Sequence, residues 1–494
     1  MYGIKKDMKN LRILVAVTSF FIFLFQSLSP SALATDPDSV IARHISALGG
    51  RGVIKSTRDF VISGKALYLG VACDFTIKSM YPDYFEERVT CDRFEVVLLR
   101  SPAGEYKKSA DGIVRKLSGL DREALVALSY VFNYAYLIDM SLPLIPECEN
   151  DPRVFTMDTG ANFGTKITLN SETNLIDSVS LKTGSGELLV SFCDYAPTNG
   201  LKIPRRMVFS GTTDMEVNDI SIKINTSLAP RDFAPLAETP HVPAKTEAFS
   251  IPLKSKDGLF FVEGTLGKKP VRFLFDTAWG EMPVAKAAES ASMGEMPFLA
   301  RFTSTESTLF ISTPTDITFL SGAFGMRSPV FIAEKIREFT GENTGIDAAI
   351  GHTLIALYPV TVDLARGELI FFPAKSFFPP KDVKKIRLTV DGGRPLVIGS
   401  VDGRCGMFIL DSTHPGFGSL LDIPTNEISK SGVKIINIGG IVFDNETLGF
   451  APKMPSYPDN AIGVLGVEFF KKFALTFDYK NGILYLEKRE GLLP

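Results

Sequence analysis

The chain has 494 residues, which is too long for one hydrophobic core, so two or three domains are expected. Apolar residues make up 45% and charged residues 22% of the chain, a balance that excludes a largely disordered protein. The formal charge of −3 argues against nucleic acid as the main partner.

The first 34 residues have the pattern of a secretory signal peptide. Basic residues precede an apolar run at 13–25, and Ala32-Leu33-Ala34 has the small-x-small pattern of a cleavage site. An uncleaved anchor is the alternative, but this run is shorter than the roughly 20 residues that span a bilayer. We therefore expect export to the periplasm or the extracellular space, cleavage near Ala34, and membrane contact only through this segment.

Residues 36–235 are predicted to form a domain with many strands and few helices. Apolar residues recur at helical spacing at 38–49 and 121–137. Strands are expected at 59–68, 73–80, 84–100, 166–169, 178–182, 188–194 and 206–210. This composition favours a curved antiparallel sheet or half-barrel whose concave face the helices cover.

The spacing of the Cys residues suggests disulfides in this domain. Cys73 and Cys91 are equidistant from Pro82, so a turn at Pro82-Asp83 would place them opposite each other on antiparallel strands. Cys148 and Cys193 then form the second bridge, in one of three connectivities that four Cys residues allow. Cys405 remains, and we expect a free structural thiol there.

This domain loosely resembles the lipoprotein-carrier (LolA-like) superfamily. The resemblance rests on an opening helix that ends in Leu48-Gly49-Gly50, a strand that ends at Tyr81-Pro82, and the Gly-Leu-Lys-Ile-Pro segment at 200–204. It implies a cavity for a lipid or another apolar ligand. The alternative is a purely structural accessory domain.

Residues 249–375 and 385–490 are predicted to be two duplicated all-β lobes, after a Pro-rich extended linker at 236–248. Three landmarks recur in the same order in both lobes, which indicates internal duplication. In the first and second lobe they are Gly264 and Gly399, the apolar strands that end at Asp276 and Asp411, and the pairs Ile350-Gly351 and Leu465-Gly466.

These landmarks resemble the two halves of a retropepsin-like aspartic protease fused in one chain, over about residues 249–488. The resemblance implies that Asp276 and Asp411 meet at a pseudo-two-fold axis and share one proton. One acid would activate a water while the other protonates the scissile carbonyl oxygen. The hydroxyls of Thr277 and Ser412 would brace the two loops. The implied function is an exported aspartic endopeptidase that acts on peptides or proteins and needs no metal or cofactor.

The third position of each motif departs from that family, which has Gly where this chain has Ala278 and Thr413. Together with Trp279 and His414, these residues are predicted to line and crowd the cleft. If the backbone at Thr413 needs a positive φ, its β-branched side chain is strained, and Thr413→Gly should raise cleavage. The alternative function is a catalytically degenerate protein of this fold that binds a peptide or an apolar ligand.

Other candidate motifs are predicted to carry no chemistry. Asp158-Thr159-Gly160 matches the protease motif literally, but it follows no clean apolar strand and reads as a turn. Asp363 and Asp478 recur in both lobes and are expected to be solvated turn carboxylates. The four His residues are scattered and form no metal-binding set.

Overall fold

The computed structural model describes residues 37–489 with several gaps. The gaps are 69, 93, 111, 139–143, 147–152, 158–164, 185, 212, 237–246, 280–283, 287–297, 304–307, 313–314, 320–323, 329, 334–344, 374–376, 380, 382, 422–434, 445, 454–456 and 459. The predicted signal peptide, Cys148, the Asp158-Thr159-Gly160 motif and most of the predicted linker therefore lie outside the described residues.

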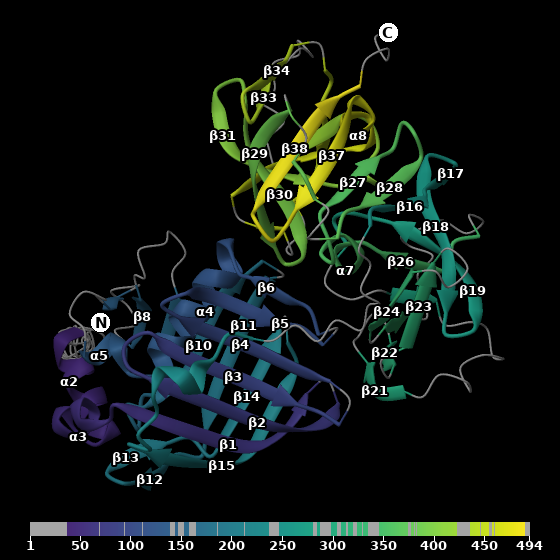
Figure 1. The fold of residues 1–494 in the computed structure, drawn as a ribbon. Helices are drawn as coiled ribbons and strands as arrows, with labels where there is room; N and C mark the ends of the chain where they lie inside the picture. Colours follow the sequence, from purple (N-terminus) through teal and green to yellow (C-terminus); the bar gives the residue numbers. More distant parts are fainter. Residues whose placement is uncertain are drawn as a thin grey trace, which may run out of the picture.

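The predicted fold class is confirmed: the chain is mainly β with few helices, and none of the large sheets is closed in the part of the chain that the structure describes. In Figure 1 the N-terminal region, coloured purple to teal, lies beside two further units coloured teal-green and green-yellow. We refer to these as the first lobe (249–373) and the second lobe (384–489). No helix in the described ranges is long and apolar enough to cross a membrane.

The N-terminal region contains one large antiparallel sheet of 13 strands, in the order β6-β5-β4-β3-β2-β1-β15-β14-β11-β10-β9-β8-β7. The strands are β1 (Asp59–Tyr68), β2 (Val71–Met80), β3 (Tyr84–Thr90), β4 (Glu95–Ser101), β5 (Gly104–Lys108), β6 (Val114–Lys116), β7 (Leu144–Pro146), β8 (Val154–Met157), β9 (Thr165–Leu169), β10 (Ile176–Thr183), β11 (Gly186–Cys193), β14 (Arg206–Gly211) and β15 (Met215–Ile224). A separate hairpin is formed by β12 (Ala196–Thr198) and β13 (Leu201–Ile203). The sequence did not predict β15, although this strand joins the two halves of the sheet.

Helix α4 (Gly119–Phe132) packs against strands from both halves of this sheet. The ring of Phe132 lies 5.9 Å from Phe85 of β3 and 5.9 Å from Phe192 of β11, between ring centroids. The single helix predicted at 121–137 is two helices, because Tyr134 has a left-handed backbone (φ 58°) between α4 and α5 (Ala135–Ile138). The other helices of the region are α2 (Pro37–Leu48), α3 (Arg51–Ser56) and the 3-10 helix η1 (Pro230–Phe233).

The disulfide between Cys73 and Cys91 forms as predicted. Strands β2 and β3 pair with Asp74 opposite Thr90, so the next position along brings the two Cys residues together. The strand predicted at 84–100 is wrong in one respect: the chain turns between Cys91 and Phe94, and two strands result.

The second predicted disulfide is not formed. Cys193 has a free thiol at the end of β11, opposite Arg206 of β14. The pairing with Cys148 was reached by elimination, and elimination gives no information on whether two sulfur atoms are within bonding distance. Cys405 is also free, as predicted, and its side chain is exposed.

The first lobe contains a ten-stranded sheet with the main order β21-β22-β25-β20-β26-β19-β18-β23-β24. The elements of the first lobe are β16 (Phe249–Pro252), β17 (Lys254–Lys256), β18 (Leu259–Leu266), β19 (Lys269–Phe275), β20 (Val284–Lys286), β21 (Phe298–Thr303), β22 (Thr308–Ser312), β23 (Thr315–Phe319), β24 (Phe324–Ser328), β25 (Phe331–Ala333), β26 (Ala348–Ile350), α7 (His352–Ile355), β27 (Val360–Asp363) and β28 (Glu368–Phe371).

The second lobe shares a sheet with the first, because β27 pairs with β37. The sheet runs β16-β28-β27-β37-β38-β29-β30-β31-β36-β32-β35. The elements of the second lobe are β29 (Lys384–Asp391), β30 (Arg394–Val401), β31 (Arg404–Leu410), β32 (Gly418–Leu421), β33 (Ile436–Ile438), β34 (Ile441–Phe443), β35 (Gly449–Ala451), β36 (Ala461–Leu465), α8 (Val467–Lys472), β37 (Phe473–Asp478) and β38 (Ile483–Lys488).

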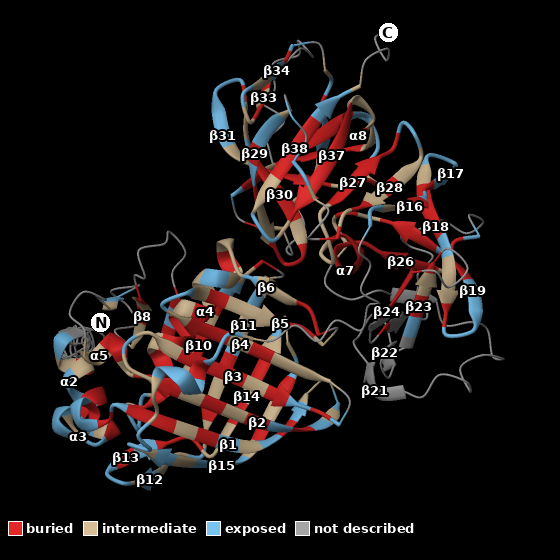
Figure 2. Cartoon of the chain, in the orientation of Figure 1, coloured by how far each residue is buried: buried red, intermediate tan, exposed pale blue. Residues whose placement is uncertain are grey.

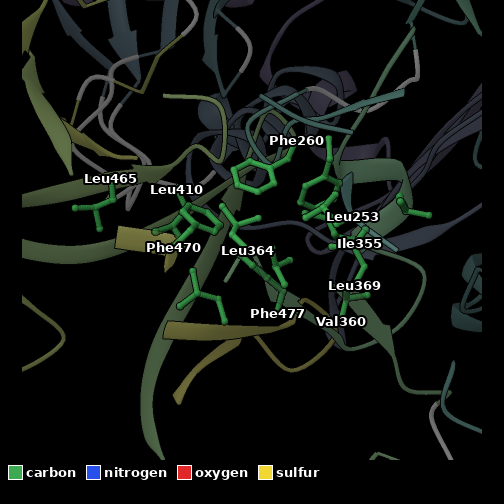
Figure 3. Packing of buried hydrophobic residues seen from close by; sticks show 14 of the residues in the cluster. Leu253, Phe260, Ile355, Val360, Leu364, Leu369, Leu410, Leu465, Phe470 and Phe477 are labelled. Carbon is green, nitrogen blue, oxygen red and sulfur yellow. The ribbon is translucent and has the colours of Figure 1, made fainter. Parts of the chain in front are cut away.

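One hydrophobic core joins the two lobes. It contains Phe260, Val360 and Leu369 from the first lobe and Leu410 and Phe477 from the second, and Figure 3 shows these side chains packed together. In Figure 2 the strands that meet between the lobes are largely buried.

Asp363 and Asp478 end strands β27 and β37, each directly before a turn, and the prediction that they are solvated turn carboxylates is wrong. Both are essentially fully buried. The Asp363 carboxylate accepts the backbone N–H of Arg366 at 3.0 Å and also forms an ion pair with Arg489. The Asp478 carboxylate accepts hydrogen bonds from the backbone and side-chain N–H of Asn481. Each carboxylate thus stabilises the turn after its strand.

Candidate active site between the lobes

Each Asp follows a strand that pairs in parallel with the strand of the downstream landmark. In the first lobe β19 pairs with β26, and the backbone N–H of Asp276 donates to the carbonyl of Ile350 at 3.1 Å. In the second lobe β31 pairs with β36, and the N–H of Asp411 donates to the carbonyl of Leu465 at 3.0 Å. The two Asp loops therefore have the same backbone support.

The glycine after Ile350 is required by close packing of the backbone. A Cβ atom at Gly351 would lie 1.8 Å from the carbonyl oxygen of Asp276. Real Cβ atoms do not approach backbone oxygen that closely, so a larger residue would push the Asp loop away.

Thr277 and Ser412 form a reciprocal hydrogen-bond network across the lobe boundary. The Thr277 hydroxyl donates to the carbonyl of Leu410 at 2.8 Å and accepts the N–H of Ser412 at 3.0 Å. The Ser412 hydroxyl donates to the carbonyl of Phe275 at 3.0 Å and accepts the N–H of Thr277 at 3.1 Å. Both side chains are fully buried. The network fixes each Asp loop against the other.

The two carboxyl groups have different surroundings. Oδ1 of Asp411 accepts three hydrogen bonds, from the N–H and hydroxyl of Thr413 at 2.8 and 2.6 Å and from the N–H of His414 at 3.1 Å. Oδ1 of Asp276 accepts the N–H of Ala278 at 2.9 Å. Asp411 therefore accepts more hydrogen bonds from its own loop than Asp276 does.

The pKa of Asp276 is raised well above its usual range. Burial is the main cause, and the negative charge of Asp411 adds to it. The N–H groups of Ala278 and Trp279 and the charge of Arg394 oppose this rise. The arrangement therefore favours a proton on Asp276.

Ala278 and Trp279, predicted to line the cleft, pack against opposite lobes. Ala278 contacts a cluster of the second lobe that includes Leu396 and Ile409. Trp279 packs on its own lobe, against a cluster that includes Leu274. The methyl group of Ala278 thus contributes to the contact between lobes.

The backbone at Thr413 is not strained. Neither Ala278 nor Thr413 is among the residues with a positive φ, so neither needs to be Gly. The His414 ring lies with Nε2 2.8 Å from the hydroxyl of Ser419, and burial lowers the pKa of the imidazole while the charge of Asp411 opposes this. The condition for strain at Thr413, a positive φ, is therefore not met.

The sequence analysis missed two residues close to the pair, Arg394 and Tyr457. Strands β30 and β31 pair with Leu396 opposite Ile409, and Arg394 and Asp411 each lie two residues beyond this last pair. The charge of Arg394 interacts with both Asp276 and Asp411. The Arg394 guanidinium lies over the ring of Tyr457, 5.7 Å from its centroid. Counting back across the Asp402-Gly403 turn would have identified Arg394, whereas Tyr457 has no comparable signal in the sequence.

Among the residues that the structure describes, no three His, Cys, Asp or Glu side chains lie close enough together to hold a metal ion. The groups at the lobe boundary are instead carboxyl, hydroxyl, guanidinium and phenol groups. This set is suited to proton transfer to and from a water or a carbonyl oxygen.

Comparisons with known proteins found likenesses in structure but not in sequence. No protein-family model matches the chain, and no curated protein matches it. Solved structures similar to part of it include basic 7S globulin from soybean (12% identity, 49% of this chain and 95% of that one, TM-score 0.35) and conglutin gamma, a basic 7S globulin from lupine seeds (12%, 50% and 96%, TM-score 0.36). An aspartic proteinase from Irpex lacteus is similar at 13% identity, over 49% of this chain and 98% of that one, with a TM-score of 0.35. Identities and TM-scores this low assign no function to this chain.

Proposed function

We propose that this protein is an exported aspartic-type peptidase that hydrolyses peptide bonds with a water activated between Asp276 and Asp411. The observation that carries the proposal is the reciprocal network of Thr277 and Ser412, which fixes the loops of two acids whose charges interact. The resemblance of the duplicated motifs to the retropepsin-like family agrees with this function.

The different surroundings of the two acids suggest a role for each. Asp411 accepts three hydrogen bonds and is suited to carry the charge and take a proton from the water. Asp276, whose pKa is raised, is suited to donate its proton to the scissile carbonyl oxygen. When the tetrahedral intermediate breaks down, Asp411 gives its proton to the nitrogen of the leaving amine, and Asp276 takes back the proton from the hydroxyl of the intermediate as the carbonyl re-forms. The two acids act as one unit with shared titration steps.

Export is part of the proposal. It is supported by the signal-like first 34 residues and by the Cys73–Cys91 disulfide, a bond that persists in oxidising compartments. N-terminal sequencing of the secreted protein tests it, and an intact Met1 on that protein would contradict it.

Cleavage of an unstructured protein by residues 35–494, measured across pH, tests the peptidase function. Activity should persist with a metal chelator and a serine-protease inhibitor. On the alkaline side it should fall as Asp276 loses its proton, at a pH above the ordinary carboxyl range. Asp276→Asn and Asp411→Asn should each reduce turnover by about 10³-fold or more, because the acids work together.

The matched control is Asp158→Asn, which changes the closest literal copy of the protease motif and should leave turnover unchanged. Full activity in both Asp276→Asn and Asp411→Asn would overturn the proposal.

The second candidate is a protein of the same fold that binds a peptide or an apolar ligand without cleaving it. A cavity of about 140 Å³ lies between α4 and the sheet, lined by Leu98, Leu125, Leu128 and other residues. It is smaller than the roughly 300–1,000 Å³ typical of ligand pockets, so its volume does not favour this function. If the wild-type protein binds a peptide but does not cleave it, the binding function is supported and the peptidase function is not.

A further inference from the structure

The N-terminal region holds one turn of the second lobe, the β29–β30 turn (Asp391 to Arg394). The hydroxyl of Ser118 donates to the carbonyl of Val390 at 2.9 Å and accepts its N–H at 3.3 Å. At the start of α4, the N–H of Leu120 donates to Oδ2 of Asp391 at 3.3 Å. The carboxylate of Asp391 thus caps a helix of the other region, where the helix dipole favours a negative group.

A second set of contacts closes around the same turn. The Asp121 carboxylate accepts the N–H of Gly392 at 3.0 Å and the N–H of Gly184 at 2.9 Å. A Cβ atom at Gly184 would lie 2.0 Å from Oδ1 of Asp391 and 2.3 Å from the nitrogen of Gly392. The β10–β11 turn and the β29–β30 turn therefore fit only because residue 184 has no side chain.

Arg394 connects this contact to the acid pair. Its Nη1 donates to the carbonyl of Gly184 at 3.3 Å, and it lies two residues before Leu396, which pairs with Ile409 two residues before Asp411. Its charge interacts with both Asp276 and Asp411. One side chain thus contacts the N-terminal region and faces the candidate active site.

The first lobe has an equivalent turn built from different residues. The β17–β18 turn occupies the equivalent place, with Lys256 where the second lobe has Asp391 and Leu259 where it has Arg394. Lys256 is exposed, and a Cβ atom at Gly258 would meet nothing within 4 Å. The contact is therefore a specific feature of the second lobe and not a consequence of the duplicated fold.

We propose that Arg394 is a positioning residue for the acid pair, and that the N-terminal region fixes it there by holding the β29–β30 turn. The inference rests on the proposed role of Asp276 and Asp411. A fixed cation beside the pair favours the carboxylate form of Asp276 and so sets the pH range over which the pair holds one proton. The N-terminal region then influences the titration of the acid pair by fixing the position of Arg394.

Several charged and titratable groups face the pair or Arg394 from the elements around them. They are Asp276, Asp411, His414, Tyr457 and Asp391, with Asp121 and Glu123 of α4 facing Asp391. The positive charge of Arg394 lowers the pKa of Asp276 and so opposes the effect of burial.

The experiment follows the Asp276 carboxyl directly, by NMR of residues 35–494 carrying ¹³C at the Asp carboxyl carbons. Loss of one signal in Asp276→Asn assigns the resonance. Arg394→Gln should shift its titration midpoint upward, because the carboxylate loses a neighbouring cation, and Arg394→Lys should keep most of the wild-type value. Gly184→Ala and Ser118→Ala disturb the hold on the turn without changing any charge, and both should shift the midpoint upward.

Two controls separate this effect from general perturbation. Gly52→Ala adds a methyl group where no atom lies within 4 Å, and Lys256→Gln removes a cation from the equivalent turn of the first lobe. Neither should move the midpoint. Thermal unfolding verifies that each variant is folded.

The outcomes are distinct. An unchanged midpoint in Arg394→Gln would overturn the role of Arg394. A shift in Arg394→Gln with none in Gly184→Ala or Ser118→Ala would overturn the hold by the N-terminal region. Because the readout needs no turnover, the predicted shifts in a chain that cleaves nothing would refute the peptidase and leave this inference standing.

Discussion

The hydroxyl of Thr413 gives the first prediction at the scale of single residues. It donates to Asp411 at 2.6 Å, and a hydrogen bond to a charged group contributes about 1.5–3 kcal/mol. Thr413→Val keeps the shape and removes the donor, so turnover should fall about tenfold to a hundredfold, since each 1.36 kcal/mol is a factor of ten. Steady-state kinetics against pH measures this loss.

Two further substitutions of Thr413 complete this test. Thr413→Ser keeps the hydroxyl and should retain most of the activity. Thr413→Gly should also reduce turnover, because it removes the hydroxyl donor and the backbone there has no positive φ that would favour Gly. The sequence alone predicted a gain. A Thr413→Gly protein that cleaves faster than wild type would show that the Thr413 side chain crowds the cleft and limits cleavage.

Thr277 gives the second prediction, on stability. Thr277→Val removes the donor to the carbonyl of Leu410 and the acceptor for the N–H of Ser412, and leaves both partners buried. Each unpaired buried group costs about 1–3 kcal/mol, so the free energy of unfolding should fall by about 2–4 kcal/mol in urea titrations. A loss below about 1 kcal/mol would contradict a structural role for the network.

A matched control lies in the sheet that joins the lobes. Thr361 and Thr476 form a hydroxyl pair at 2.7 Å between β27 and β37, away from the Asp loops. Thr361→Val should also reduce stability, but the pH dependence of cleavage should stay at the wild-type value. In Thr277→Val both should change.

At the scale of elements, local patterns predicted the strands well and long-range pairing poorly. The strand at 59–68 and the paired positions of Cys73 and Cys91 follow from alternation and from symmetry about Pro82. The central strand β15 was missed, since its pattern of Glu, Asn, Asp and Lys is more polar than a typical strand. A polar strand is recognised only when its neighbours on both sides are known.

The candidate site divides in the same way. The duplicated landmarks identified both Asp motifs, because each lobe repeats the same strand and turn spacing. The contacts of Asp391, Arg394 and Tyr457 could not be predicted, since they depend on how a turn of one lobe meets a different region of the chain. Trp279 was predicted to line the cleft because it is adjacent to the motif in sequence, but it packs on its own lobe. Sequence position alone does not determine which way a side chain packs.

Asp391 gives a prediction for the pH dependence of stability. Burial, together with the charge of Asp121, raises its pKa from 3.8 to about 8. Between these values the folded chain binds more protons than the unfolded chain. The stabilisation is therefore complete below about pH 4 and is lost as the pH rises towards 8.

In Asp391→Asn the side chain at this position does not titrate. The free energy of unfolding should therefore decrease less from pH 5 to pH 8 in this variant than in wild type. Urea unfolding at the two pH values, followed by the fluorescence of Trp279, measures the difference. Asp257→Asn changes the equivalent turn of the first lobe and should behave like wild type. Equal pH slopes for Asp391→Asn and wild type would show that Asp391 is already charged in the folded chain.

At the scale of the whole molecule, the hydrophobic cores divide the chain into two cooperative units. One core contains residues of both lobes, from Ile251 to Leu486. The cores of the N-terminal region contain none of the lobe residues. Because the lobes share a core and a sheet, we expect them to unfold together and the N-terminal region to unfold in a separate step.

Two variants should affect these steps independently. The Cys73–Cys91 bridge closes a loop of 18 residues in the N-terminal region, and a loop of this size contributes about 3 kcal/mol. Replacing both Cys residues with Ala should lower the unfolding temperature of the N-terminal step, seen as faster amide exchange in β2 and β3. The lobe step, followed by the fluorescence of Trp279, the only Trp, should stay in place. Thr277→Val should lower the unfolding temperature of the lobe step and leave the N-terminal step in place. A single calorimetric transition that both variants shift equally would mean that the β29–β30 contact couples the whole chain into one folding unit.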